Sequence, residues 1–479
     1  MPSKSLYSGH FHCTSTILDV AESSYRLPNG NKIENDVNKV DLELISRETI
    51  KPSSPTPQHL RTFNLSVIDQ FMHDVYTPLI LFFPNTNEDS VTDVVTKRSR
   101  HLKESLSAIL TSFYPFAGKV KDNMQIECND EGVYYIEARV NETLEEFLHH
   151  PSDERVRWLK PEKPCTEESS KGNYVMGIQV NIFKCGGIGL SMSMSHKIFD
   201  GHTCFIFLKA WAAATRGSTK IVSPSFVAFK IFPTNPCLEN APSFQLFSSE
   251  MISTKRFMFD ASALAMLKAQ PIVVSGRSTK PPTRTVATTA VIWKAAAKAA
   301  SKVRPFGPKS PHALFSVVNL RNRASPPLPT ESVGNLIDLA GAVCYPHGHL
   351  DLVTMMGDIA DSMARINSDY FGYLKQQKGQ TLLSEVLKIS SQLTGGDCFG
   401  ATSVLNSGMY ELDFGWGKPL WFYIMNPMNA RGVALNDTPK GGGVEAKVTL
   451  SPDEMEIFEH DSELLSYATV NPSPLNFVY

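Results

Sequence analysis

His196 and Asp200 are the two side chains whose types and spacing could do chemistry. A neutral imidazole, with a pKa near 6.5, can accept a proton at neutral pH. The spacing alone proves little, because 13 His and 48 Asp plus Glu in 479 residues give roughly one His-x-x-x-Asp match by chance. The chain contains three such matches, His149…Asp153, His196…Asp200 and His347…Asp351.

The surrounding sequence selects the second match. Residues 188–196 alternate between apolar and very small side chains, which predicts a strand with His196 last on its apolar face. Asp200 and Gly201 then turn the chain, and residues 202–216 predict a helix. The other two matches lie in proline-containing segments that predict loops. A histidine at the end of a buried strand is well placed to be a base, and the same position also suits a core histidine with satisfied hydrogen bonds.

Length and composition exclude several classes of protein. A chain of 479 residues predicts at least two domains, and 42% hydrophobic with 20% charged residues is typical of a soluble globular protein. A net charge of -2 and a pI of about 6.7 give no electrostatic case for nucleic acid or an anionic membrane. No apolar run is long enough for a membrane span, so none is expected.

The cysteines and the first residues indicate the compartment. The eight cysteines are scattered, and none forms a Cys-x-x-Cys pair, so we expect no metal site. No secretory segment is recognised, which predicts free thiols and a cytoplasmic protein. Residues 1–38 are polar and unpatterned, which predicts a disordered or loosely attached extension.

Strands and helices mix along the rest of the chain, so the fold class is α/β, or α+β with mixed sheets. Turn residues predict two hairpins, one from 125–128 and 133–140 and one from 174–184 and 188–195. The segment 217–248 is rich in Pro, Ser and Asn and predicts a crossover between halves. Further predictions are a strand at 40–46, a short turn or helix at 65–71, a helix at 90–113, a strand at 255–259, helices at 261–269 and 285–301, a strand at 314–320, helical stretches at 350–375 and 381–393, a strand at 420–425, a hairpin ending at 444–450 and a helix at 452–465.

A second glycine-punctuated segment, residues 413–419, is the remaining candidate for chemistry. The sequence has no Gly-x-Ser-x-Gly elbow, P-loop, complete dinucleotide loop or His-Glu-x-x-His motif. Together, the two segments resemble the BAHD family of plant acyl-CoA-dependent acyltransferases. His196 to Gly201 matches the family's His-x-x-x-Asp-Gly motif, and Asp413-Phe414-Gly415-Trp416-Gly417 matches its second motif without a change.

The resemblance extends over about residues 40–470. Four more stretches are similar to the family, at 50–57, 65–70, 114–119 and 319–321. It implies a two-domain, chloramphenicol acetyltransferase-like fold with an interdomain channel. The expected organisation is an extension at 1–38, an N-terminal domain at 39–220, a crossover at 221–250 and a C-terminal domain at 251–479. Within the family, the sequence is most similar to the branch that acetylates alkaloid alcohols.

The family resemblance implies an acyltransferase that uses acyl-CoA as a co-substrate and holds no permanently bound cofactor or metal. The acceptor is expected to be a small-molecule alcohol, and the protein a monomer. His196 would be the general base that removes the acceptor's proton as the oxygen attacks the thioester. Holding both substrates at one centre would make the reaction effectively unimolecular, so no acyl-enzyme is needed.

The resemblance also assigns structural residues. Asp200 is expected to turn away from the channel and pair with Arg321, and the simpler alternative is that Asp200 caps the helix that starts at Gly201. Asp413 is a candidate catalytic residue. For that motif, however, a tight turn built by Gly415, Trp416 and Gly417 is the favoured interpretation.

Three features bear on the substrates. Lys255 and Arg323 are candidates for the CoA phosphates, although such cations more often lie on the surface. Family members often carry Thr-Ser-Trp-x-Arg-x-Pro before the second motif, whereas this chain has Val404, Asn406 and Gly408 at the changed positions after Thr402. With Phe199 reshaping the wall or filling the core, these changes predict a roomy, less cationic pocket for a bulky neutral acceptor.

Two other functions stay open from the sequence. An uncharged amine could attack the same thioester, which would make the protein an N-acyltransferase. A non-catalytic member of the family could instead bind a metabolite or a protein partner, although intact His196 and Asp200 count against this function. The sequence names neither the acyl chain nor the acceptor.

Overall fold

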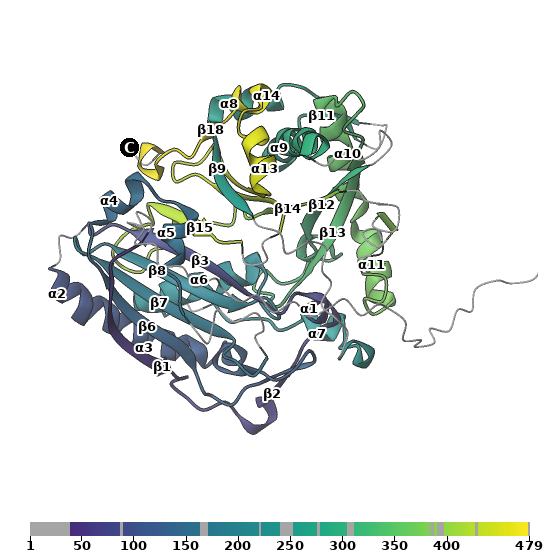
Figure 1. The fold of residues 1–479 in the computed structure, drawn as a ribbon. Helices are drawn as coiled ribbons and strands as arrows, with labels where there is room; N and C mark the ends of the chain where they lie inside the picture. Colours follow the sequence, from purple (N-terminus) through teal and green to yellow (C-terminus); the bar gives the residue numbers. More distant parts are fainter. Residues whose placement is uncertain are drawn as a thin grey trace, which may run out of the picture. The chain divides into compact units, whose positions relative to one another are not determined.

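Strand β8 (Ile188–Ser195), which carries the candidate histidine at its end, lies inside a six-stranded mixed sheet. The computed structural model describes residues 39–86, 90–162, 171–219, 222–239, 252–274, 278–303, 311–382, 384, 388–389, 397–426 and 430–477. The order of the first sheet is β1 (Leu42–Ile50), β6 (Val133–Val140), β7 (Met176–Phe183), β8, β3 (Tyr76–Phe83) and β15 (Trp421–Ile424) (Figure 1). Its β6–β7 pair is parallel and the other pairs are antiparallel.

Both faces of this sheet are covered. All eight residues of β7 and all eight of β8 are buried, as expected for strands with helices or loops on both sides. Helices α3 (Ser99–Leu110) and α6 (Gly201–Thr215) pack with the sheet in one apolar cluster. Helices α4 (Leu144–His149) and α5 (Asp153–Arg157) contribute to a second cluster, with Phe82 and Trp421.

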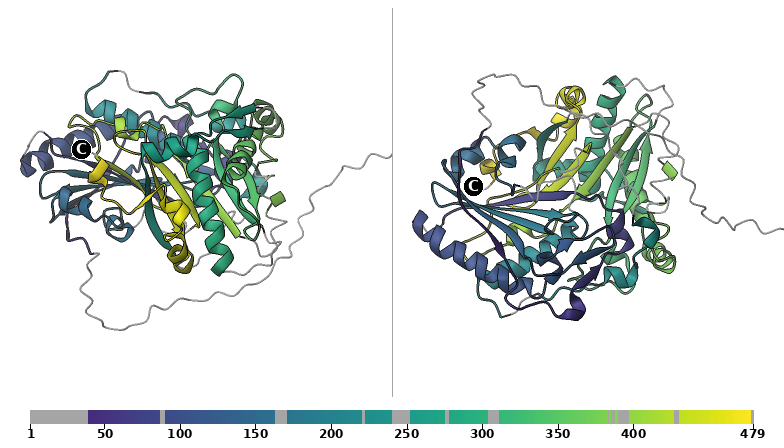
Figure 2. Two further views of the ribbon diagram at one scale, coloured as in Figure 1. Left: turned by 90° about the horizontal axis from the view of Figure 1, so that it is seen from above. Right: turned by 60° about the horizontal axis from the view of Figure 1, so that its bottom comes forward.

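The second sheet is also mixed and has seven strands. Its order is β13 (Ile337–Cys344), β12 (His312–Asn319), β14 (Asp397–Ser403), β16 (Gly432–Asp437), β17 (Val444–Leu450), β9 (Ser253–Phe259) and β18 (Thr469–Val470). Helix α9 (Arg284–Val303) lies against these strands (Figure 2) and packs with α8 (Ala261–Lys268), α10 (Leu352–Arg365) and α13 (Pro452–Phe458). Seven alanines on α9 are buried, and their small side chains allow close packing, at positions 287, 290, 295, 296, 297, 299 and 300.

Smaller strands and helices accompany the two main sheets. They are a three-stranded sheet of β2 (Thr62–Asn64), β5 (Gln125–Glu127) and β4 (Lys119–Val120), a β10 (Ile272–Val274) and β11 (Ser278–Lys280) pair, and the short helices α1 (Val67–Phe71), α2 (Val91–Asp93), α7 (Ala228–Ile231), α11 (Ser368–Gln376) and α14 (Ser462–Leu465). A π-helical turn at Val94–Arg98 joins α2 to α3.

The predicted secondary structure around the candidate histidine is confirmed. The hairpin of β7 and β8 forms with antiparallel pairing, and α6 follows it directly. The mixed sheets confirm the predicted fold class. The sequence predicted a strand at 420–425, and the structure shows that its partner is β3 of the first sheet, with Trp421 opposite Phe82.

Other predictions were wrong or are not tested. The hairpin predicted from 125–140 does not form, because β5 pairs with β2 and β4 whereas β6 pairs with β1 and β7. The predicted helices at 350–375 and 452–465 are each two helices with a break. Residues 1–38 and most of the predicted helix at 381–393 lie outside the described residues, and the three predicted domain boundaries stay predictions.

Candidate active site

His196 follows the last residue of β8 and is held through its main chain. Its N–H donates to Val75 O at 2.8 Å, and its carbonyl accepts from Asn335 Nδ2 at 2.8 Å. Nδ1 of the ring is buried and has no hydrogen-bond partner among the described residues, whereas the residue as a whole is only half-buried. Nε2 is therefore the ring nitrogen that remains accessible.

The surroundings of His196 favour its neutral form. Burial lowers its pKa below the ordinary value of 6.5, because a charged ring loses hydration there, and the nearby Lys197 cation acts in the same direction. Its own carbonyl, Asp200 and the Asn335 side chain act in the opposite direction, but the pKa stays lowered. A ring that is neutral at physiological pH with an accessible nitrogen can accept a proton.

Asp200 follows the turn at His196 in the chain, and its carboxylate makes two kinds of structural contact. Its Oδ1 accepts from Thr203 N at 2.8 Å, which caps α6. The same carboxylate accepts from Arg321 Nη1 at 2.6 Å and Nη2 at 3.2 Å, and from Leu336 N at 3.2 Å. Asp200 therefore both caps α6 and pairs with Arg321, so both alternatives from the sequence describe contacts that are present. Neither makes Asp200 a partner of the His196 ring.

Arg321 ties the second half of the chain to the start of α6. Its side chain is almost fully buried and donates to Ser332 O at 3.0 Å and Gly334 O at 2.9 Å as well as to Asp200. Burial alone would raise the pKa of Asp200, but the Arg321 guanidinium and the hydrogen bonds hold it below its usual value of 3.8. The pair is thus a buried, hydrogen-bonded ion pair.

Sequence reasoning missed two titratable neighbours of His196, Lys197 and His73. Lys197 turns away from the ring, and its Nζ donates to Gln70 O at 3.2 Å, Met72 O at 2.6 Å and Asn123 Oδ1 at 2.7 Å. Burial lowers the pKa of Lys197 to about 8. His73 is half-buried, and burial together with the nearby His196 and Lys197 lowers its pKa to about 4. No motif in the sequence places His73 beside His196.

Asn335 was also missed. It is fully buried, and its Nδ2 donates both to His196 O and to Asp69 Oδ1, at 2.8 and 2.9 Å. A single asparagine after a glycine carries no periodic signal, so the sequence could point to it only through its contacts in the folded chain.

Segment 402–408 lies against the first turns of α6. A Cβ built on Gly201 would come within 3.1 Å of Val404 Cγ1, and one on Gly408 within 3.0 Å of the Phe205 ring. Of the three expected candidates, Val404 lies against the start of α6, whereas Thr402 lies on β14 and Asn406 contacts Arg284 and Asp437.

A cation that the sequence analysis did not anticipate reaches this segment. Arg284, at the start of α9, donates to Asn406 Oδ1 at 2.7 Å and to Asp437 Oδ1 at 2.9 Å. Arg284 thus brings a cation to Asn406 from another element, and Asp437 balances its charge. The less cationic pocket wall stays a prediction.

Phe199 belongs to the core. It is buried, and its ring centroid lies 4.2 Å from that of Phe116 and 6.5 Å from that of Phe207. Of the two roles expected for Phe199, filling the core is the one that these contacts describe.

A family model described as the Transferase family matches residues 40–465. The chain belongs to the BAHD transferase family of plant acyltransferases. A limonoid 7-O-acetyltransferase of Citrus sinensis is 36% identical over 466 residues, covering 91% of this chain and 100% of that protein. An N-malonyltransferase of Strychnos nux-vomica, which acts on 17,18-epoxy-17-hydroxycur-19-ene, is 33% identical over 433 residues, covering 90% and 91%.

Solved structures agree with this assignment. The crystal structure of vinorine synthase is similar with a TM-score of 0.76 and 33% identity, covering 90% of this chain and 99% of that one. The family resemblance and the predicted chloramphenicol acetyltransferase-like fold are confirmed. Structures that share the fold at only 17% identity, with TM-scores of 0.65 and 0.62, contain coenzyme A or ethyl coenzyme A.

The second BAHD motif forms a tight turn far from His196. Asp413 Oδ1 accepts from Gly415 N at 2.7 Å and from Gly417 N at 3.0 Å, and both glycines have φ of +107°. The Trp416 ring packs 6.4 Å from the ring of Phe83, which pairs with Ile188 at the opposite end of β8. The nine residues from 188 to 196 span about 26 Å, so the structure does not support a catalytic role for Asp413.

Asp413→Ala is expected to affect folding more than chemistry. Losing the acceptor for two N–H groups should reduce the free energy of unfolding by about 1–2 kcal/mol, while kcat of the folded protein stays within a few-fold. Asp413→Asn keeps one acceptor oxygen and should lose less. Urea unfolding and steady-state kinetics test this, and a loss of rate of about 100-fold without a change in stability would contradict it.

The two cations proposed for CoA differ in the structure. Lys255 on β9 forms an ion pair with Glu459, so its charge is already balanced. Arg323, two residues after Arg321, is half-buried, and its guanidinium has no hydrogen bond or ion pair within the described part of the chain. Arg323 is therefore the better remaining candidate for a phosphate.

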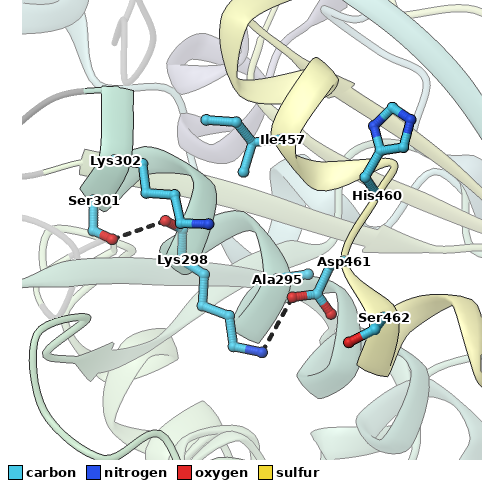
Figure 3. Close-up of a pocket in the computed structure, with 8 residues that line it drawn as sticks. All are labelled: Ala295, Lys298, Ser301, Lys302, Ile457, His460, Asp461 and Ser462. Atoms are coloured by element: carbon cyan, nitrogen blue, oxygen red, sulfur yellow. Dashed lines mark hydrogen bonds and ion pairs between the residues drawn. The ribbon is translucent and has the colours of Figure 1, made fainter.

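A hollow of about 510 Å³ lies elsewhere, between α9 and the α13–α14 turn (Figure 3). Lys298 Nζ of α9 donates to Asp461 Oδ2 at 3.2 Å and to Glu463 Oε2 at 3.1 Å. Figure 3 shows Lys298 facing Asp461. None of the predicted site residues lines this pocket. Lys302 and His460 also line this pocket, which lies on other elements than the His196 site.

The described residues offer few other kinds of site. No helix there is long and apolar enough to cross a membrane, and no group of His, Cys, Asp or Glu there could hold a metal ion. Cys204, the cysteine nearest to the motif in sequence, is buried, and burial raises the pKa of its thiol well above the usual value. A thiol of this kind is a poor nucleophile.

Proposed function

We propose that this acyltransferase moves an acyl group, acetyl or another short or branched chain, from acyl-CoA to a hydroxyl of a bulky neutral plant metabolite. The observation that carries the proposal is the accessible Nε2 of a half-buried, neutral His196 between the two halves of the chain. Family membership and the O-acetyltransferases among the relatives support the reaction class.

The chemistry needs a base because an aliphatic hydroxyl hardly ionises at neutral pH. In the proposed step, Nε2 of His196 takes the hydroxyl proton while the oxygen attacks the thioester carbon. The resulting oxyanion collapses, the C–S bond breaks, and the protonated His196 returns its proton to the CoA thiolate. No bond to the protein forms, in keeping with the buried, high-pKa Cys204.

The acceptor side is proposed to lie along segment 402–408. Val404 and Gly408 are smaller than the tryptophan and the proline that family members often carry at these positions. The Arg284 charge is balanced by Asp437, so a carboxylate on the acceptor gains no free cation there. Both features favour a bulky, uncharged acceptor over a small acid.

On the donor side, we propose that Arg323 binds a phosphate of CoA and that Lys255 does not. Phosphate recognition favours a planar, five-donor guanidinium that is not already paired. Acyl-CoA enters and leaves as a co-substrate, and the interdomain channel implied by the family stays part of the proposal.

The test measures CoA release from the full-length chain with acetyl-CoA, malonyl-CoA and a branched acyl-CoA. Each donor is offered matched pairs of bulky acceptors that differ only in a hydroxyl or an amino group, plus carboxylated analogues of the alcohols. We expect turnover with a neutral alcohol and little with its carboxylated analogue.

Two results would contradict the proposal. Preference for the amine of a matched pair would make the protein an N-acyltransferase, a chemistry found in the Strychnos nux-vomica relative. Binding of CoA without turnover on any acceptor, by a protein that unfolds cooperatively, would favour a non-catalytic role.

A further inference from the structure

Lys197, the residue after His196, has a buried ammonium with three hydrogen-bond acceptors around it. The residue is only 4% exposed. Its Nζ donates to Gln70 O at 3.2 Å, to Met72 O at 2.6 Å and to Asn123 Oδ1 at 2.7 Å. An ammonium carries three protons, so these three oxygens match its donors one to one.

Contacts on neighbouring elements hold the residues that supply these oxygens. The Gln70 side chain exchanges two hydrogen bonds with the main chain of Asn235, at 2.7 and 3.1 Å. Asn123 Nδ2 donates to Leu238 O at 2.7 Å, so the oxygen of this amide is the atom that faces Lys197. The ammonium therefore joins α1, the loop before β5 and the segment that follows α7.

His196 and Lys197 hold one segment of the chain at two points. The two carbonyls that Lys197 binds come just before Val75, whose own carbonyl accepts from His196 N at 2.8 Å. Segment 70–75 is thus tied at both ends to the turn that carries the base. Loss of the Lys197 contacts would leave this segment, and the His196 main chain attached to it, more able to shift.

We propose that Lys197 is a positioning residue whose ammonium clamps segment 70–72 and thereby holds His196 in place, so that the active site works only while Lys197 is protonated. A neutral amine has two donors for the three acceptors and would turn a lone pair toward one of the oxygens, so the clamp would loosen. The inference deepens the proposed function and rests on it, because it concerns how the same base is held.

The charges near Lys197 set the pH at which the clamp would loosen. Burial lowers the pKa of Lys197 to about 8, although Asp74 and Asp69 act in the opposite direction. Lys197 is therefore protonated at neutral pH and loses its proton as the pH rises through about 8. The charged or titratable groups on the elements around it are Asp69, His73 and Asp74 on the α1 side, Lys121 and Asp122 in the loop before β5, Glu239 after Leu238, and His196.

The first test is kinetic and compares the wild type with Lys197→Met. In the wild type, kcat/KM should fall as the pH rises through about 8. Lys197→Met has a side chain of similar length without donors, so it should lose this alkaline limb. Its kcat at pH 7 should be about 10- to 100-fold lower, the scale expected from misplacing a reacting group by about 1 Å.

Lys197→Arg separates the charge from its titration. A guanidinium keeps the positive charge and does not lose its proton in this range, so Lys197→Arg should keep more of kcat at pH 7 than Lys197→Met and should also lack the alkaline limb. A wild-type profile that stays flat to pH 9, or an alkaline limb that persists in Lys197→Met, would mean that Lys197 has only a structural role and would overturn the inference.

Lys447→Met is the matched control. Lys447 is also 4% exposed, its Nζ donates to Ile424 O, and burial lowers its pKa to about 7, but it lies on β17 of the second sheet. This control should keep the alkaline limb of the wild type. If Lys447→Met removes the limb and Lys197→Met keeps it, the limb belongs to Lys447 and the inference is overturned.

The second test needs neither a variant nor an acceptor. Hydrogen exchange is measured in the wild type from pH 7 to 9 at the N–H groups of Met72 and His196, which donate to Asp69 O and Val75 O. Each rate is divided by the intrinsic rate at the same pH. Protection of both groups should fall as the pH passes about 8, whereas that of Phe183 N–H, which donates to Gly187 O at the far end of β8, should stay constant.

Constant protection at Met72 and His196 through pH 9 would overturn the inference. Because exchange is measured without substrates, this result is independent of turnover. A wild type that turns over no acceptor but loses protection at these two positions would contradict the proposed function and leave the clamp in place.

Discussion

His196→Ala is expected to lower kcat by about 10²- to 10⁴-fold, the range that a positioned general base contributes. The physical reason is that no other described side chain offers the same combination of an accessible nitrogen, a lowered pKa and a main chain fixed by Val75 and Asn335. CoA release at saturating acyl-CoA and acceptor measures the effect. The affinity for CoA and the melting temperature should change little.

Two other histidines make this prediction specific. His202 is half-buried on α6 and its ring bonds Thr330 O at 2.8 Å, so His202→Ala should keep kcat within a few-fold. His73 is the competing base, because it is the second imidazole whose charge is coupled to this site. A large loss of rate in His73→Ala together with near-normal turnover in His196→Ala would assign the base to His73 instead.

The pH profile of kcat/KM in the wild type is a second test of His196 as the general base. Neutral imidazole is the active form, and burial lowers the pKa of His196 below 6.5, so kcat/KM should stay flat through neutral pH and, on the acid side, fall only below about 6.5. The residual activity of His196→Ala should lack this acid limb. An acid limb that begins above 6.5 would contradict the neutral, buried ring.

The local part of the site could be predicted from the sequence. The period-two pattern of residues 188–196 and the short Cys185-Gly186-Gly187 turn define strands that pair with their neighbour in the chain, and β7 and β8 do so. The N-cap at Asp200 involves residues only three positions apart. Contacts of this kind depend on adjacent residues, which a single sequence displays directly.

Pairing between distant strands could not be predicted in this way. Residues 129–132 have ordinary turn chemistry, but the strands before and after them join different sheets. Thr56 helps to fix this turn, because its N–H and hydroxyl donate to Asp130 at 2.9 and 2.6 Å from 74 positions away. Turn residues indicate where a chain reverses, and they do not specify which strands then pair.

The residues that surround the histidine show the same limit. Arg321 was found because a family resemblance supplied it, whereas Arg284 and Asn335 had no such guide. Arg284 reaches Asn406 across 122 positions, and Asn335 reaches His196 across 139. Each is an ordinary residue in its own segment, and only the folded chain gives it a role.

Arg321→Ala is expected to reduce the free energy of unfolding by about 3–5 kcal/mol, the cost of leaving a buried carboxylate without its partner. The Asp200 and Arg321 side chains are only 4% and 3% exposed, and the guanidinium also holds Ser332 O and Gly334 O. Chemical denaturation of both proteins at pH 7 measures the difference. The free energy of unfolding of Arg321→Lys should lie between those of the wild type and Arg321→Ala, because an ammonium keeps the charge and loses the bidentate contact.

An exposed ion pair on the same chain supplies the control. Lys418 and Glu411 lie 2.5 Å apart with side chains 60% and 72% exposed, so Lys418→Ala should change stability by no more than about 1 kcal/mol. An Arg321→Ala loss as small as this would contradict the prediction.

The pH dependence of stability gives an independent test of the cause. The pKa of Asp200 in the folded chain is below 3.8, so the pair stabilises fully above 3.8 and loses its effect as the pH falls through the folded value. The stability gap between the wild type and Arg321→Ala should therefore be constant near neutrality and narrow in acid, whereas a gap caused by lost packing alone would persist.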